Sequence, residues 1–469
     1  MKKLLLALLA ITSFGVANAQ QYALFDTKTM FDAFENPSQK SFTLNSSRRF
    51  SSNFFLPYLG TNAINKGSSK LAIRKLTQEG VFDTRILPIG TGEVNHFFEN
   101  SNIYVAAFRL FMSYKDQKEM GFSWQIRSDA NIDYTNETLV IFNSFERFNT
   151  DQLYPGILDT KGYEQSYHQF SFTYRENWNK RLAFGLKASI LSGILYNKLD
   201  VSDSYLYITP GSNDPLISLK GTYSANFADF KEVGQKNFFP NFKNPGLSLG
   251  FGTNYTTEKG LFLMANIKDL GFIWWRSNTQ RTTINQPDGI PNIVNNQSNI
   301  NQQIKDIFLH SGQPKKFLAP TNAKLDVYLS KRYDFYKPAL AVSKNLFYKG
   351  GDIAFVNTFI FNDLSGSITP LYNLNGVFMV GLQGKYQMPN FELFMGTDNL
   401  VATTFQTYGL LKKDATVGSG PNGASFYMGV GIKFGSVVNH PQFADRIPVI
   451  NGNEGESFFK SLFSVFKRK

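Results

Sequence analysis

The chain has 469 residues and a net charge of +12, and it contains no cysteine and four histidines. The absence of cysteine excludes disulfides, thiolate metal sites and a lipid-modified N-terminal cysteine, and so few histidines argue against catalysis. Apart from the last three residues, Lys and Arg form no dense block, which favours anionic lipid headgroups or protein partners over nucleic acid. We therefore expect a protein that is not an enzyme, with no catalytic residues, metal or cofactor.

Residues 1–19 have the features of a secretory signal peptide. Lys2 and Lys3 precede an apolar run from Leu4 to Val16, and the small-residue site Ala17-Asn18-Ala19 follows. The run is shorter than the roughly 20 residues that a transmembrane helix needs, so an uncleaved anchor is the weaker alternative. We expect the signal peptide to be cleaved and the protein exported.

The remaining chain contains no apolar stretch near the length of a membrane helix, so only a closed β-barrel would take it across a bilayer. Its 46 Phe, 22 Tyr and 4 Trp residues make up 15% of the chain. Such an aromatic content suits the two girdles that flank the apolar band of a membrane barrel.

Alternation of apolar and polar residues indicates long strands joined by hairpins. Tyr104 to Tyr114 and Phe122 to Arg127 form one predicted hairpin, and 169–175 with 182–190 form a second. A third joins 247–252 to 261–267, and 426–434 forms a strand near the end. A soluble β-sandwich also alternates, but its strands are shorter than the roughly 9 to 11 residues of a membrane strand. The Gly, Ser, Gln, Arg and Lys of the second face further suit a polar lumen.

The sequence predicts an all-β fold, a transmembrane antiparallel barrel of about 12–14 strands. Weaker strand candidates complete the count at Phe50 to Tyr58, Ser218 to Ala228, 325–332, 338–347, 353–361, 377–386 and 391–397. We expect residues 20–49 to be an inward segment and candidate plug, residues 50–436 to be the barrel, and residues 437–469 to be a periplasmic tail. Asn278 to Gln313 has the composition of a long polar loop, with disorder as the alternative. Thr135 to Thr150 is a short helix or a ragged strand.

Charged residues on the second face are candidates for lining the lumen. They are Arg109, Arg127, Arg175, Lys187, Lys385, Glu392 and Lys433. These residues line a cationic pathway or, in the simpler interpretation, form ion pairs that satisfy a polar interior. Ser248 lies in a G-x-S-x-G pattern, but its place within an alternating strand favours a small lumen-facing residue over a nucleophile.

The last residues of the chain predict a basic amphipathic helix. Phe459, Leu462, Phe463 and Phe466 recur at helical spacing, with Lys and Arg elsewhere. This apolar stripe is a candidate for docking to a partner or to the membrane surface. Packing against the rim of its own barrel is the alternative.

Three motifs resemble those of a known group of barrels. They are 32–38, which contains Asn36-Pro37, the strand around Tyr174-Arg175 with 180–185, and 391–400, which contains Gly396-Thr397-Asp398-Asn399-Leu400. Together they resemble Bacteroidetes outer-membrane barrels of the domain-of-unknown-function 5723 group, and more distantly FadL-type and PorP/SprF-type barrels. The resemblance implies that Asn36 and Pro37 belong to a plug, although position 38 is Ser where the relatives commonly have Ala.

Two functional hypotheses follow for a protein of the bacterial outer membrane. In the first, the barrel transports or binds a hydrophobic or small ligand through its lumen. In the second, it is a scaffold or plug subunit of a type IX secretion or gliding-motility complex, an assembly that the resemblance implies. Its expected partners are outer-membrane lipid and, in the second hypothesis, other envelope or secretion-complex proteins.

Overall fold

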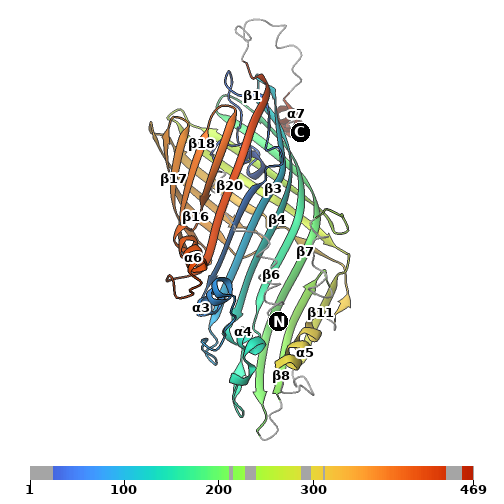
Figure 1. Cartoon of the computed structure of the whole chain (residues 1–469). Coiled ribbons are helices and arrows are strands. Elements are labelled where there is room, and N and C mark those ends of the chain that lie inside the picture. Colours follow the sequence, from blue (N-terminus) through green and yellow to red (C-terminus); the bar gives the residue numbers. More distant parts are fainter. Residues whose placement is uncertain are drawn as a thin grey trace.

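The computed structural model describes residues 25–210, 215–227, 239–286, 297–309, 312–439 and 457–467. The proposed signal peptide lies outside these residues, as does much of the predicted tail. One antiparallel sheet closes into a barrel with 14 strand positions (Figure 1), which confirms the predicted fold class. None of the described helices is long and apolar enough to cross a bilayer.

Fifteen strands occupy the 14 positions because β1 and β2 follow one another between β20 and β3. In chain order the wall consists of β1 (Arg48–Ser52), β2 (Tyr58–Lys66), β3 (Val94–Ser113), β4 (Lys118–Thr135), β6 (Lys161–Asn177), β7 (Leu182–Ile208), β9 (Pro245–Thr256), β10 (Leu261–Trp275), β14 (Lys324–Lys331), β15 (Tyr336–Asn345), β16 (Gly351–Phe361), β17 (Leu364–Asn373), β18 (Val377–Gln387), β19 (Phe391–Thr397) and β20 (Asn422–Val437). The predicted single strand from Phe50 to Tyr58 is wrong, because the chain breaks its pairing between β1 and β2.

The two rims of the barrel differ in the length of their connections. The short-turn rim carries the tight turns at 114–117, 178–181, 257–260, 332–335, 362–363 and 388–390. The long-loop rim carries 67–93, 136–160, 209–244, 276–323, 346–350, 374–376 and 398–421. Every connection of more than five residues between wall strands lies at the long-loop rim, although 346–350 and 374–376 at this rim are short. Long loops gathered at one rim are typical of outer-membrane barrels.

An apolar belt covers the outer face of the wall. Leu270 and Phe272 on β10, Phe355 on β16 and Phe378 on β18 are 45%, 48%, 47% and 64% exposed, whereas inward-facing residues such as Arg109 are fully buried. This inverts the burial pattern of a soluble protein and indicates that the belt faces a bilayer. On β7 the belt ends before Lys198, where the outward side chains become polar and exposed.

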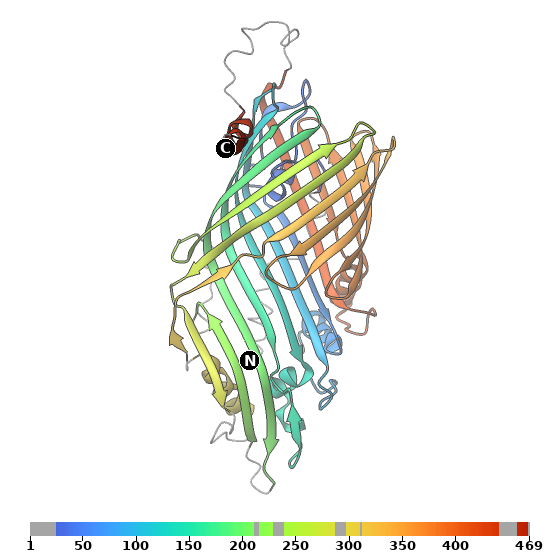
Figure 2. The ribbon, with the colours of Figure 1, turned by 180° about the vertical axis from the view of Figure 1, so that it is seen from behind.

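The long strands β3, β4, β6 and β7 continue past the belt at the long-loop rim (Figures 1 and 2). There they support a small apolar core that includes Val140, Ile157, Leu206, Ile217 and Ile284. The elements around it are α3 (Lys70–Arg74), the π-helix η2 (Lys75–Glu79), α4 (Asn136–Asn143), the 3-10 helix η3 (Phe145–Arg147), β5 (Leu153–Pro155), β8 (Pro215–Ala225), β11 (Gln280–Gln286), α5 (Gln297–Leu309) and β12 (Gln313–Pro314). Also at this rim, β13 (Phe317–Pro320) pairs with β10, and α6 (Leu400–Lys412) contacts β18 and β20.

Two predictions for this region need correction. The segment from Ser218 to Ala228 was counted as a wall strand, but β8 pairs with the far end of β7 and with β11, outside the closed barrel. The segment from Asn278 to Gln313 was expected to be a polar loop, yet it contains β11 and α5, whose Ile284 and Ile304 are buried in the small core. Thr135 to Thr150 forms α4 and η3, which is the helical alternative.

Candidate functional site: the lumen and its inward segment

Residues 25–47, here called the inward segment, lie within the barrel. Their short helix α2 (Asp32–Glu35) is completely surrounded, and all four of its residues are buried. The Phe31 ring lies 5.3 Å from those of Tyr58 and Tyr104, and the Phe34 ring lies 5.8 Å from Tyr104. Aromatic packing of this kind gives the segment an apolar anchor in an otherwise polar lumen.

The turn at Asn36 and Pro37 rests on two wall glycines. Asn36 Oδ1 accepts hydrogen bonds from Ser38 N at 3.0 Å and from Ser38 Oγ at 2.9 Å. Gly185 on β7 and Gly252 on β9 are register partners beneath this turn. A Cβ at either glycine would come closer than 3.0 Å to the turn, which real Cβ atoms essentially never do. Glycine at both positions therefore lets the backbone approach the wall.

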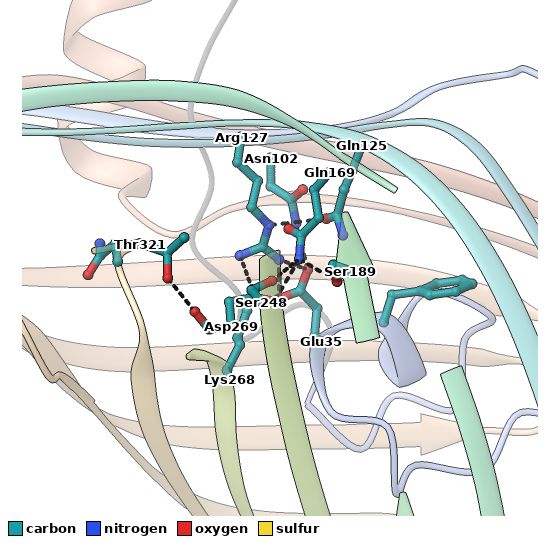
Figure 3. Close-up of polar contacts among 12 residues, drawn as sticks. Glu35, Asn102, Gln125, Arg127, Gln169, Ser189, Ser248, Lys268, Asp269 and Thr321 are labelled. Carbon is teal, nitrogen blue, oxygen red and sulfur yellow. Dashed lines mark hydrogen bonds and ion pairs between the residues drawn. The ribbon is translucent and has the colours of Figure 1, made fainter. Parts of the chain in front are cut away.

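Glu35 lies at the centre of a buried ionic network (Figure 3). Its carboxylate pairs with Arg127 at 3.0 Å and with Lys268, and it accepts hydrogen bonds from Asn102 Nδ2 and the Tyr104 hydroxyl. These four contacts come from β3, β4 and β10, so they join α2 to three strands. A buried carboxylate is costly unless it is paired, and the contacts therefore oppose removal of α2 from this position.

Asp269 completes the network from the wall. It pairs with Arg127 at 2.8 Å and with Lys187 at 2.7 Å. The β9–β10 register shifts between Ile267 and Leu270, and Asp269 has a φ of 52°. This bulge turns the successive residues Lys268 and Asp269 both inward, where strict alternation would place one of them in the lipid.

Cationic side chains from the wall also hold the backbone of the inward segment. Lys187 Nζ donates to the Phe34 carbonyl at 2.7 Å, Arg175 Nε to Ser38 at 2.8 Å, and Lys433 Nζ to Ser41 at 2.7 Å. Lys337 donates to the Asp26 carbonyl at 2.8 Å, and Lys385 donates to Thr27. An irregular segment inside a barrel needs such donors because its carbonyls lack a strand partner.

The structure brings all seven sequence-predicted lumen residues together around this segment. Arg109 contacts Ser41, Arg127 contacts Glu35, Arg175 contacts Ser38, Lys187 contacts Phe34, Lys385 contacts Thr27, Glu392 contacts Met30 and Lys433 contacts Ser41. Sequence reasoning missed Lys268, Asp269 and Lys337. The adjacent charges in the otherwise apolar 261–275 segment were an available signal for the bulge.

Around the described part of the inward segment, the lumen also contains two polar cavities and an apolar layer. The vestibule, a cavity of about 810 Å³, lies between the inward segment and the strand ends at the short-turn rim. The long-loop chamber, of about 40 Å³, is lined by polar residues that include Glu99, Asp129, Asn322 and Asp352. The apolar layer, here called the apolar septum, contacts both cavities. It consists of Phe25, Ile64, Phe98, Met264, Tyr328, Ala339, Ala341, Ala354, Val356, Leu371, Val377 and Met379.

The septum touches both cavities. Phe25 and Val356 also line the vestibule, and Phe98 also lines the long-loop chamber. Ala339, Ala341 and Ala354 project from β15 and β16, so the septum meets small side chains on this part of the wall. The ionic network that holds α2 instead involves β4, β7 and β10.

The C-terminal helix α7 (Phe458–Lys467) packs on the outside of its own barrel. Phe459 is 1% exposed, and its ring lies 6.0 Å from Tyr174 and 5.7 Å from Phe184. The buried carboxylate of Glu176 accepts from the backbone N–H of Phe459 at 2.8 Å and from the Ser457 hydroxyl.

Of the other predicted docking residues, Phe463 also faces the barrel, with its ring 5.6 Å from that of Phe184. Leu462 is 42% exposed, and the Phe466 side chain lies outside the described part.

Within the described residues, no group of three His, Cys, Asp or Glu side chains is placed to hold a metal ion. Ser248 is buried and accepts a hydrogen bond from Gln169 at 3.4 Å, and among the described residues no histidine is hydrogen-bonded to it.

The fold and site define a closed β-barrel whose lumen is filled by an N-terminal segment of its own chain. Residues 45–398 match the model of the family of unknown function DUF5723, so the chain belongs to this family. No curated protein matches the sequence.

Several solved structures are similar in outline. A deletion mutant of the monoaromatic hydrocarbon channel TodX has 9% identity and a TM-score of 0.40, covering 90% of this chain and 96% of that chain. The toluene transporter TodX of P. putida has 9% identity and a TM-score of 0.37, covering 91% and 97%. The β-domain of the Bordetella autotransporter BrkA has 6% identity and a TM-score of 0.23, covering 82% and 99%.

Proposed function

We propose that this protein is a non-enzymatic barrel of the bacterial outer membrane that transports or binds a hydrophobic or small ligand through its lumen. The observation that carries the proposal is the apolar septum, whose residues line both polar cavities. A dry apolar constriction opposes ions because it excludes water, while it offers a small apolar ligand a favourable surface.

The route runs along β15–β18 and not beneath the inward segment. Opening the lumen at α2 would break the ion pairs of Glu35 and the hydrogen bond from Lys187 to the backbone. Breaking buried ion pairs costs free energy because it leaves unpaired charges behind. Opening the septum would move side chains such as Phe25 and Phe98, with no charge left unpaired. The part of the segment around α2 therefore acts as a fixed filling, and the septum, to which Phe25 at the start of the segment contributes, acts as the gate.

Orientation follows from the connections. Outer-membrane barrels place short turns in the periplasm and long loops outside the cell. On this basis the vestibule faces the periplasm and the long-loop chamber faces the exterior.

Purified protein in planar bilayers and in liposomes tests the proposal. We expect little ion conductance from the wild-type protein and discrete conductance from Phe25→Ala, which removes an aromatic ring from the septum. Ile368→Ala, on the exposed outer face of β17, is the matched control and should conduct like the wild type. A Phe25→Ala barrel that is folded and yet sealed to ions and to small aromatic solutes would contradict transport along this route.

The second candidate is a scaffold subunit of a type IX secretion or gliding-motility complex. The observation that favours it is the exposed apolar surface of α6 at the long-loop rim, where Val401, Tyr408 and Leu411 are 53%, 51% and 75% exposed. Co-purification from envelopes with and without Val401→Ser and Leu411→Ser tests this idea. Loss of specific envelope proteins with the double variant would support a scaffold, and an unchanged set would contradict it.

A further inference from the structure

The vestibule contains far more positive than negative charge. Nine Lys and Arg side chains line it, against three Asp side chains. In a confined cavity with low-dielectric walls, such an excess focuses a positive potential.

The acidic residues in the vestibule are largely engaged already. Asp32 accepts hydrogen bonds from Thr27 N at 2.8 Å, Thr27 Oγ1 at 2.6 Å, Lys28 N at 2.8 Å and Thr29 Oγ1 at 2.5 Å. Asp26 pairs with Lys337 at 3.1 Å. Neutral donors therefore occupy most acceptor positions of Asp32, and Asp26 is already paired, so neither carboxylate forms an ion pair with the remaining cations.

Most of the cations lack a carboxylate partner. Among the described residues, no carboxylate forms an ion pair within 4.0 Å of Lys28, Lys40, Arg175, Lys180, Lys385 or Lys433. Arg175, Lys385 and Lys433 donate to carbonyls of the inward segment, whereas Lys28 and Lys40 project from the segment itself into the cavity. The cavity also presents amide and hydroxyl donors, including Asn254 and Thr358.

We propose that the vestibule binds a small soluble polyanion that carries phosphate or carboxylate groups. Anionic oxygens would take the charge-assisted hydrogen bonds that these lysines offer. A cavity of about 810 Å³ has the size of a small-molecule site. It lies inside the barrel and not on the apolar belt, which favours a soluble anion over a lipid headgroup. This site is independent of the proposed transport, because binding needs no open septum.

Isothermal titration calorimetry on the full-length protein in uncharged detergent tests the proposal, with sodium tripolyphosphate and citrate as probes. We expect saturable binding of at least one of them that weakens as the salt concentration rises. Lys28→Gln with Lys40→Gln should weaken it by about tenfold or more, because two charge-assisted hydrogen bonds are lost. Within the described part of the chain, neither lysine side chain forms a hydrogen bond, so folding should be preserved, which heat-modifiability on gels verifies.

The matched control removes two charges from turns of the same rim, as Lys115→Gln with Lys259→Gln, and neither residue lines the cavity. This variant should bind the probe like the wild type. Equal weakening in both double variants, or no saturable binding of either anion to the wild type, overturns the proposal. A second titration uses micelles doped with phosphatidylglycerol. Loss of binding there would identify a lipid headgroup as the occupant and would also overturn the soluble-anion assignment.

Discussion

Gly185 on β7 lies directly opposite Gly252 on β9, and together they form the flat seat on which Asn36 and Pro37 rest. Neither glycine is at a turn, so what requires glycine is the close approach of a second backbone. The two glycines thus place the Asn36-Pro37 turn against β7 and β9, which are far from it in the sequence.

Gly185→Ala should disturb this seat. The new Cβ would overlap the Pro37 carbonyl group, so the turn must move, at a cost of about 1–3 kcal/mol. We expect faster proteolysis within residues 25–47 while the barrel remains heat-modifiable. Gly384→Ala on β18 is the control, because no atom lies within 4 Å of a Cβ at that position. Equal protease resistance in both variants would contradict the seat.

Glu35→Gln tests the buried network. The variant leaves Lys268 with a neutral partner and Arg127 with Asp269 alone, and breaking such a buried pair costs about 3–5 kcal/mol. We expect a clear fall in the denaturant midpoint of the detergent-solubilised barrel. Glu258→Gln removes an exposed carboxylate that pairs with Arg181, and it should leave the midpoint unchanged. The account of the network fails if the two variants unfold alike.

Phe459→Ala should release the C-terminal helix. It removes a buried ring from between Tyr174 and Phe184, and truncation of a core Phe costs about 3–5 kcal/mol. Because this packing is the main apolar contact of α7, we expect proteases to cleave the helix while the barrel survives. Leu462→Ala, at an exposed position of the same helix, should stay protected. A Phe459→Ala helix that remains resistant would contradict the docking.

Phe272→Lys tests the assignment of the belt to lipid. A lysine on the lipid face near the middle of the bilayer costs about 2–4 kcal/mol in membrane barrels. We expect slower folding into lipid vesicles and a lower unfolding free energy there. Ser202→Lys, on the exposed polar part of β7 beyond the belt, should fold as the wild type does. Similar folding of both lysine variants would place the membrane elsewhere on the wall.

Alternation in the sequence was sufficient to predict the barrel, three of its hairpins and the inward direction of the seven charged residues. It failed where a single extra residue reverses the two faces. Strict alternation places Tyr104 on the same face as Phe108, but the register shifts between Tyr104 and Ala106, and Tyr104 therefore points inward. The bulge at Lys268 and Asp269 reversed the faces of β10 in the same way.

The contacts of the inward segment were beyond reach of the sequence for a different reason. Its position before the first strand predicted that it lies inside, but Glu35 meets Lys268 across 233 residues of chain. No local pattern encodes such a pair. The small core at the long-loop rim was missed because Asn and Gln dominate residues 278–313, although Ile304, Ile307 and Phe308 recur at helical spacing and lie in or against this core.

The most direct test of the account is cysteine labelling in two places within the lumen, which the absence of native cysteine makes unambiguous. One cysteine replaces Ala354 in the septum, and the other replaces Ser189 beside the ionic network. Each is exposed to a small charged thiol reagent in the wild-type and Phe25→Ala backgrounds. We predict that position 354 is protected in the wild type and labelled in Phe25→Ala, while position 189 stays protected in both. Labelling of position 189 with continued protection of position 354 would show that the lumen opens beneath the inward segment, and it would contradict the septum as the gate.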